Sequence, residues 1–460
     1  MTQDEKFKYM TTTPVPQLIS KLAVPTMISM MITALYNAAD TFFVGKIDVQ
    51  ASAAVGIVFN LMAIIQAFGF TFGHGSGILV SLSLGKKEDE KAKTIANSGF
   101  VYAIAFGALL AACCFMLRIP LAYILGSTDT ILPYSLDYMN IILIGMPWMM
   151  GSLVLNNQIR YQGNAMTSML GIMSGAVLNV ALDPLLIFVF KLGIRGAAIA
   201  TVTGQLVSFI ILWITTYKGD NIPISLKPKY LTARYFPTVF AKGFPSLLRQ
   251  GLAATAGILL NAQVKEVVLD PVMQDNALCA MGLVSRVSMI ANALLIGFGQ
   301  GFQPVCSYNF GAKLYKRVLQ GFKFCVLIAL YFLITVSIVI FIFAPFIITF
   351  MMPSSEEVTR LGSLALRAQC LTYPFGSIII ITNMLLQASG QSKEASLVAS
   401  GRQGLFLLPV LLILPRIFGL YGVLFAQPVA DAGSFVLAGI FAILFVKKVN
   451  KWEKLKGESV

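Results

Sequence analysis

The chain has 460 residues, of which 57% are hydrophobic and only 12% are charged, and its formal net charge is +14. Soluble globular domains are typically ~25% charged, so this composition excludes an ordinary soluble enzyme or binding domain. The positive charge is spread over short connecting segments, as expected for loops that face anionic lipid, and we therefore expect no nucleic-acid partner.

Long stretches without Asp, Glu, Lys or Arg run through the chain, for example at 49–85, 287–312 and 324–355. Each exceeds the roughly 20 residues that a helix needs to cross a bilayer, and only helices or closed barrels satisfy their backbone polar groups in lipid. We predict an all-α integral membrane protein with twelve transmembrane helices, at 16–44, 52–84, 91–117, 131–160, 164–190, 195–217, 236–265, 276–309, 314–350, 357–387, 393–415 and 419–447.

The longest polar break is Lys218–Ala233, which contains Gly219, Pro223 and Pro228. Clusters of this kind mark loops rather than helices. We therefore expect a six-helix bundle at 1–217, a linker at 218–233, and a second six-helix bundle with a basic tail at 234–460.

The two predicted bundles repeat each other at a constant spacing of 226 residues. Identical residues at this spacing occur at both ends of the repeat, which chance rarely produces. Six helices per bundle give both bundles the same orientation, so the sequence predicts a parallel repeat related by a pseudo-two-fold axis along the membrane normal. Matching pairs include Gly73 and Gly299, Gly85 and Gly311, Lys87 and Lys313, Gly193 and Gly419, and Gly196 and Gly422.

The basic residues also predict the orientation. With the N-terminus inside, Lys and Arg are about three times as frequent in inner as in outer segments, which is the positive-inside pattern. The first 20 residues are polar and contain Pro14 and Pro16, so we expect no cleavable signal peptide. The sequence predicts a multi-pass protein of the plasma or inner membrane with both termini in the cytoplasm.

Four segments spread over nearly the whole chain carry polar and glycine-rich motifs: Leu35–Gly45, Asn179–Pro184, Gly299–Pro304 with Asn309–Ala312, and Phe418–Gly422 with Gln427–Asp431. In this order they resemble helices 1, 5, 8 and 12 of the multidrug and toxin extrusion (MATE) transporters, in particular the bacterial branch of MepA and DinF. The resemblance implies export of cationic, lipophilic drugs and other xenobiotics, antibiotics among them, driven by inward movement of H⁺ or Na⁺.

Among the acidic residues within the predicted helices, Asp40 and Asp183 in particular need a functional or structural reason. A charge in a membrane helix costs roughly 2.5–3.5 kcal/mol. Asp183 follows Asn179 by one helical turn and precedes Pro184, which leaves a backbone carbonyl without its donor. Such an oxygen-rich group suits H⁺ or Na⁺. The alternative is that the acids only bond neighbouring helices. By the resemblance, the cation-coupling residues are Tyr36, Asp40, Asn179, Asp183 and Thr201.

Candidates for the substrate cavity are polar or flexible residues near these acids and in helix 12. Methionine clusters in the first half suit a promiscuous apolar cavity, although core packing is the commoner reason for methionine. The candidates are Asn37, Asn157, Met31, Met150 and Asp431. We interpret the intramembrane arginines as helix-end or ion-pair groups rather than substrate contacts: Arg249, Arg286, Arg367 and Arg402.

Other features that could be mistaken for functional motifs have structural interpretations. Gly69, Gly73 and Gly77 recur every four residues, as do Ala293, Gly297 and Gly301, which favours close helix approach. The segment Gly69–Gly77 is neither a phosphate-binding loop nor a nucleophile elbow. His74 has no evident partner, and one histidine nearly excludes a histidine-based metal site. The six cysteines lack CxxC spacing and are expected to be reduced. We expect no cofactor beyond H⁺ or Na⁺, and no metal.

The sequence therefore favours a monomeric cation-coupled antiporter that binds small cationic amphipathic molecules and exports them by alternating access. A lipid-linked oligosaccharide flippase of the same architecture remains an alternative, supported by Arg249 and Arg286 and opposed by the intramembrane acids. A membrane-embedded enzyme lacks a catalytic cluster. A receptor or channel would leave the duplicated halves unexplained.

Overall fold

The structure is a computed structural model that describes residues 2–218, 220–353 and 355–457. Within these ranges the chain is almost entirely helical and contains no strand, which confirms the predicted all-α class. A short helix not predicted from the sequence comes first. It is α1 (Gln3–Thr12), whose N-terminus is closed by a capping box between Thr2 and Glu5.

The first half contains six long helical segments and one short helix, α5 (Arg118–Ile124), between the third and fourth segments. The fifth segment changes from α-helix to π-helix directly after Pro184, where proline cannot donate a backbone hydrogen bond. The long segments are α2 (Val15–Val44), α3 (Val49–Gly85), α4 (Asp89–Met116), α6 (Leu132–Tyr161), α7 (Ala165–Pro184) with its π-helical extension η1 (Leu185–Val189), and α8 (Gly193–Tyr217).

The second half repeats this order after two 3₁₀ turns, η2 (Pro228–Tyr230) and η3 (Ala233–Tyr235). Its fourth segment breaks at Pro374, and its fifth segment again contains a π-helix. The segments are α9 (Phe236–Val267), α10 (Pro271–Gly311), α11 (Tyr315–Met351), α12 (Glu356–Thr372) with η4 (Tyr373–Phe375) and α13 (Gly376–Ala388), α14 (Ser392–Ser400) with η5 (Gly401–Phe406) and α15 (Leu407–Phe418), and α16 (Leu420–Gly457).

Eleven of these twelve segments are long and apolar enough to cross a membrane, counted over the described residues. The exception is α9, which has sufficient length but carries the polar pair Arg249–Gln250 near its middle. A membrane helix keeps such residues only where they face a cavity or a partner. Because α9 is less apolar than the other eleven segments, we expect its polar residues to face a site between the bundles.

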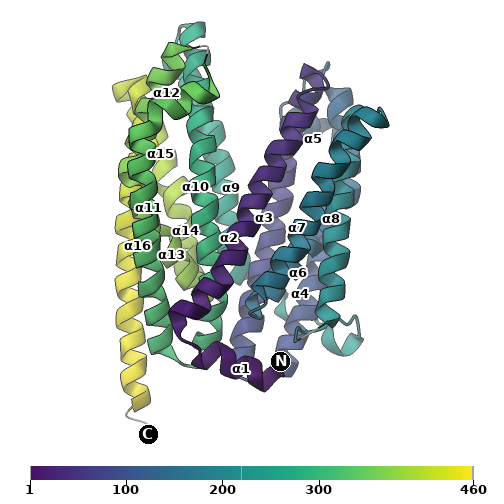
Figure 1. Ribbon diagram of the computed structural model, residues 1–460, viewed down its shortest axis with the longest axis vertical. Coiled ribbons are helices and arrows are strands. Elements are labelled where there is room, and N and C mark those ends of the chain that lie inside the picture. Colours follow the sequence, from purple (N-terminus) through teal and green to yellow (C-terminus); the bar gives the residue numbers. More distant parts are fainter. Residues whose placement is uncertain (1, 219, 354, 458–460) are drawn as a thin grey trace.

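The helices form two bundles that meet at one end and diverge toward the other (Figure 1). Segments α2 to α8 make the first bundle and α9 to α16 the second. The bundles meet at the end that carries α1 and both chain termini, and diverge at the end that carries α5 and α12. The most extensive contacts that join the bundles are α2 on α10, α3 on α9 and α3 on α10.

Glycine contacts at the joined end show the pseudo-two-fold relation. A Cβ on Gly85 would lie 2.2 Å from the carbonyl oxygen of Tyr308, and a Cβ on Gly311 would lie 2.3 Å from that of Leu82. Leu82 and Tyr308 are themselves separated by the repeat spacing. The two halves therefore meet through the same contact made twice.

The glycine stripes have the predicted role. Added Cβ atoms on Gly69, Gly73 and Gly77 would each clash with a side chain of α6. In the second half, Gly297 and Gly301 lie against the backbone of α2. These glycines allow close helix approach within the first bundle and between the two bundles, as small residues do in membrane proteins.

Candidate functional site

A cavity of about 250 Å³ is lined by residues of both bundles. The first bundle contributes lining residues from α2, α3, α6, α7 and α8, and the second from α9 and α10. The apolar lining residues are Met30, Ile65, Phe70, Met149, Leu153, Ile172 and Ile296. The polar lining residues are Thr26, Ser29, Thr33, Tyr36, Gln66, Asn156, Arg160, Ser168, Gln205, Arg249, Gln250 and Gln300.

The joined end of the bundles closes the cavity on one side. Arg160 donates from Nη1 to the backbone oxygen of Gln300 at 2.7 Å, across the two halves. Thr26 donates from its hydroxyl to the carbonyl oxygen of Gly297 at 2.6 Å. These two buried hydrogen bonds and the contacts of Gly85 and Gly311 hold the bundles together at this end, and we call this set of contacts the seal.

His74 belongs to this seal. Its Nδ1 lies 2.8 Å from the hydroxyl of Ser246 in the other half, so it has a partner that the sequence does not indicate. Ser246 also accepts a hydrogen bond from Gln387 at 2.9 Å. His74 is buried and stacks on Phe70, which lines the cavity.

The structure brings the predicted cation-coupling residues together in the first bundle. Asn179 donates to the hydroxyl of Thr201 at 3.3 Å, and Asp40 and Asp183 lie near enough to interact electrostatically. Tyr138 of α6 joins this group, with Asp40, Asp183 and Thr201 around its hydroxyl. The sequence analysis missed Tyr138, because its partners come from three other helices.

Several polar atoms of this cluster are buried without a hydrogen-bond partner among the described residues. They are Oδ1 of Asp40, both carboxyl oxygens of Asp183, Oδ1 of Asn179 and the hydroxyl of Tyr138. Buried polar atoms are normally satisfied, and each exception needs an explanation. Two carboxyl groups, an amide oxygen and a phenol that converge in this way offer oxygen ligands for a proton or a small cation.

A small pocket of about 20 Å³ connects this cluster to the main cavity. Asn179 and Thr201 line the small pocket, while Tyr36, Ile172 and Gln205 line both spaces. Tyr36 is buried and lies close to both Asp40 and Gln205. An ion bound at the acids and a molecule in the cavity would thus contact opposite sides of the same few side chains.

The substrate-cavity candidates whose side chains the structure describes do not line the cavity. Met31 is 42% exposed, whereas its neighbour Met30 lines the cavity. Met150 is buried against Gly107, and Met149 lines the cavity instead. One helical position rotates a side chain by about 100°, which moves it to another face.

Asn157 follows the same pattern. It is fully buried and accepts a hydrogen bond from Arg160, while Asn156 lines the cavity. The side chain of Asn37 lies outside the described residues.

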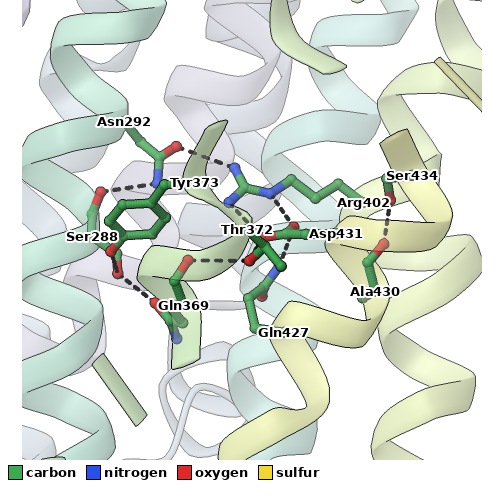
Figure 2. A network of polar contacts seen from close by, with 10 residues as sticks. All are labelled: Ser288, Asn292, Gln369, Thr372, Tyr373, Arg402, Gln427, Ala430, Asp431 and Ser434. Atoms are coloured by element: carbon green, nitrogen blue, oxygen red, sulfur yellow. Dashed lines mark hydrogen bonds and ion pairs between the residues drawn. The ribbon is translucent and has the colours of Figure 1, made fainter. Parts of the chain in front are cut away.

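Asp431 is the centre of a different network, in the second bundle (Figure 2). Arg402 donates from Nε to Oδ1 of Asp431 at 2.8 Å, and Gln427 donates to the same oxygen at 2.9 Å. Arg402 also donates to Oδ1 of Asn292 at 3.1 Å. Neither Arg402 nor Asp431 lines the central cavity. Asp431 is therefore held in an ion pair and Arg402 has the structural role expected of it.

The Arg402 network occupies the repeat-related position of the small pocket. Residues Ala176, Thr201 and Gln205 of the first bundle correspond, at the repeat spacing, to Arg402, Gln427 and Asp431. Where the first bundle has a pocket beside free carboxyl groups, the second has a guanidinium bound to a carboxylate. The acidic cluster with unpartnered oxygens is thus a property of the first bundle.

Arg249 differs from the expectation, because it lines the cavity and forms no ion pair among the described residues. Arg160 is a further lining residue, which the sequence pattern does not single out because it is the last residue of a predicted helix. The break in apolar pattern at Arg249–Gln250 was the signal that could have identified the wall of α9.

Comparison with known proteins gives one consistent match. Residues 25–185 and 267–412 match the protein-family model described as MatE. The chain is 24% identical to the "Multidrug export protein MepA" of Staphylococcus haemolyticus (strain JCSC1435), over 95% of each chain. It is 25% identical to the protein of that description from Staphylococcus aureus (strain MSSA476), over 96% of each chain. A solved structure described as "Outward-facing conformation of a multidrug resistance MATE family transporter of the MOP superfamily" superposes with a TM-score of 0.88 at 21% identity, covering 95% of this chain and 99% of that one.

Proposed function

The chain belongs to the MatE family of multidrug efflux transporters, and on this premise we propose that it is an antiporter, which exports small amphipathic molecules in exchange for H⁺ or Na⁺. The family membership makes it a multi-pass membrane transporter rather than an enzyme. The coupling ion, the antiport mechanism and the orientation in the membrane are parts of the proposal.

One observation carries the coupling proposal: the acidic cluster has unpartnered oxygens and shares Tyr36 with the central cavity. A buried carboxylate without a partner is costly, and a bound proton or Na⁺ removes that cost. Binding of the cation changes the charge at Asp40 and Asp183 and thereby the packing of α2 against α7. Because α2 also packs against α10 of the other bundle, this change reaches the seal between the bundles.

We propose that the joined end faces the cytoplasm and the diverging end faces outside. This orientation places the basic linker, the loop with Lys86 and Lys87, and the basic C-terminal tail inside, as the positive-inside pattern requires. The conformation then has its cavity sealed from the cytoplasm. Export would alternate between this state and one in which the bundles meet at the other end.

The ion gradient supplies enough energy for this cycle. Moving one elementary charge across a potential of 100 mV releases roughly 2.3 kcal/mol. One or two cations per cycle therefore support a substrate gradient of roughly 40-fold to 2,000-fold, since about 1.4 kcal/mol corresponds to a factor of ten.

Taken alone, the resemblance to multidrug exporters favours cationic substrates. Asp40 and Asp183 would attract such molecules, but both lie behind Tyr36 rather than on the cavity wall. All seven helices that enclose the cavity belong to one chain, and we propose that the monomer is the working unit.

The test is efflux from vesicles that contain the purified protein, with pH and Na⁺ gradients imposed separately. Two fluorescent probes of fixed charge, ethidium and 1-naphthalenesulfonate, cover both signs of substrate. We expect one of the two ion gradients to drive efflux of at least one probe. Asp183→Asn should abolish the driven component.

Asp137→Asn is the matched control. Asp137 is also an aspartate of the first bundle, but it forms a surface ion pair with Arg195 at 2.8 Å. The control should retain driven efflux, because a surface ion pair contributes little. Driven efflux that persists in Asp183→Asn at the wild-type rate would contradict the proposal.

A further inference from the structure

We propose that the central cavity selects amphipathic anions. Arg160 and Arg249 form the recognition site for a single carboxylate or sulfonate group, and the apolar wall holds an aromatic or aliphatic body. This inference rests on the proposed export function and names its substrate class, which is opposite in charge to the class that the family resemblance implies.

The guanidinium of Arg160, a lining residue of the cavity, has a donor without a partner in the described part of the chain. Only 1% of the residue's surface is exposed, and it uses Nη1 on the backbone of Gln300 and Nη2 on the side chain of Asn157. Its Nε is buried without a partner among the described residues. A guanidinium has five N–H donors in a planar fork, the geometry that matches a carboxylate.

Arg249 faces the same cavity from the other bundle. Its one described hydrogen bond is a long contact of 3.4 Å from Nη1 to the side-chain oxygen of Asn383. Next to it, Nε2 of Gln250 is a second buried donor without a partner among the described residues. The wall of α9 thus presents donors that the protein itself does not satisfy.

The charge of the cavity is uncompensated. No Asp or Glu lines it, and neither Arg160 nor Arg249 belongs to an ion pair of the described chain. The two guanidinium groups lie within range of each other's charge, and their interaction is repulsive. Two like charges held close together are costly, and an anion bound between them relieves both the repulsion and the missing hydrogen bonds.

Arg402 shows how this protein treats an arginine whose role is structural. It lies in a membrane helix and is half-buried, as Arg249 is, yet it is bound to Asp431, and Asn292 accepts one of its remaining hydrogen bonds. The cavity arginines lack an equivalent carboxylate. The difference indicates that their counter-charge arrives with a ligand.

The remaining surface of the cavity suits the apolar part of such a ligand. Phe70, Met30, Met149 and Leu153 provide an aromatic face and flexible apolar side chains. The volume of about 250 Å³ is just below the roughly 300–1,000 Å³ of typical ligand pockets, which fits a molecule of one or two rings.

Equilibrium binding to the purified protein tests the inference with three probes that share one ring system. They are 1-naphthylacetate, its neutral amide, and 1-naphthylethylammonium. We expect the carboxylate to bind most tightly and the ammonium least. Arg249→Gln should weaken carboxylate binding roughly 10- to 100-fold, the usual contribution of a charge-assisted hydrogen bond in a desolvated site, and should change amide binding little.

Arg286→Gln is the control, since Arg286 is another arginine of the second bundle but lies in α10 and lines a separate apolar groove. Gln250→Leu removes a neutral donor and covers the case in which an arginine variant folds poorly. Equal affinity for the three probes, or tightest binding of the ammonium, would overturn the inference. Tighter binding of a polyprenyl pyrophosphate than of naphthylacetate would overturn it in favour of a lipid-linked substrate.

Driven efflux of ethidium that depends on Asp183, together with no binding of naphthylacetate, would refute the anion selectivity and leave the export function intact. Naphthylacetate binding that depends on Arg249, without driven transport of any probe, would refute the export function instead.

Discussion

Replacing Gly75 by Ala should open the joined end of the two bundles. A Cβ at this position would lie 1.9 Å from the carbonyl oxygen of Val239, 2.9 Å from its carbonyl carbon and 3.1 Å from the backbone nitrogen of Gly243. All three atoms belong to the backbone of α9, so no side chain can move aside. Carbon atoms in contact normally lie about 3.5–4.0 Å apart, and α3 and α9 must therefore separate by about 1 Å.

The cost of that separation falls on one state of the transport cycle. Introducing a methyl group into a packed interface costs about 1–3 kcal/mol. This free-energy cost is absent in the state in which α3 and α9 are already apart at this end. The equilibrium between the two states should therefore shift roughly 5- to 150-fold toward the state open at the joined end.

The assay is the distance between spin labels at two exposed positions, Lys91 of the first bundle and Lys316 of the second, after Cys113, Cys114 and Cys279 have been replaced by Ser. Gly75→Ala should lengthen and broaden this distance. Gly257→Ala is the matched control, since nothing lies within 4 Å of the Cβ that it adds to α9. Distance distributions that coincide for wild type and both variants would refute the assigned role of Gly75.

Three further predictions follow from other parts of the structure. A single Cys introduced at Lys227 should react with an impermeant maleimide in inverted vesicles but not in intact cells. A single Cys introduced at the exposed Leu269 should react in intact cells but not in inverted vesicles. The same labelling pattern at both sites would contradict the proposed orientation. Burial lowers the pKa of Lys6 from 10.5 to about 8, against a smaller opposing effect of Asp220. The folded state then binds fewer protons than the unfolded state between these values, so the unfolding free energy of wild type relative to Lys6→Met should rise by up to about 3 kcal/mol as pH increases from 8 to 10.5; no rise would refute the burial of a titrating amine. Arg402→Gln should destabilise the protein by about 3–5 kcal/mol, because it leaves Asp431 buried without its partner, and adding Asp431→Asn should recover part of the lost melting temperature; additive losses would show that the two do not act as a pair.

The sequence predicted the fold well because its strongest signals are those that lipid imposes. Charge-free stretches and the repeat spacing identified twelve helices and two parallel bundles. The short helices α1 and α5 were missed because they lie outside the apolar stretches, where amphipathic or short segments give a weak signal. The π-helix in the fifth segment of each bundle depends on packing that the sequence pattern does not encode.

The candidate site was predicted unevenly, for a geometric reason. Asp40, Asn179 and Asp183 were found because polar residues in apolar helices are conspicuous one by one. The lining residues depend on helix rotation, and an error of one position selects Met31 or Met150 in place of Met30 or Met149. The partners Tyr138, Arg160 and Arg249 come together from separate helices, so the sequence could not reveal that Arg249 lacks a carboxylate.

Ion movement driven by substrate is the most direct test of the central claim that the acidic cluster couples ion and substrate transport. A transported probe is placed on one side of vesicles that contain the protein, with no ion gradient at the start, and internal pH and Na⁺ are followed. We predict that the substrate gradient drives H⁺ or Na⁺ in the opposite direction, and that Asp183→Asn loses this ion movement while it still binds the probe. Substrate flux without any counter-movement of either ion in the wild type would contradict the account.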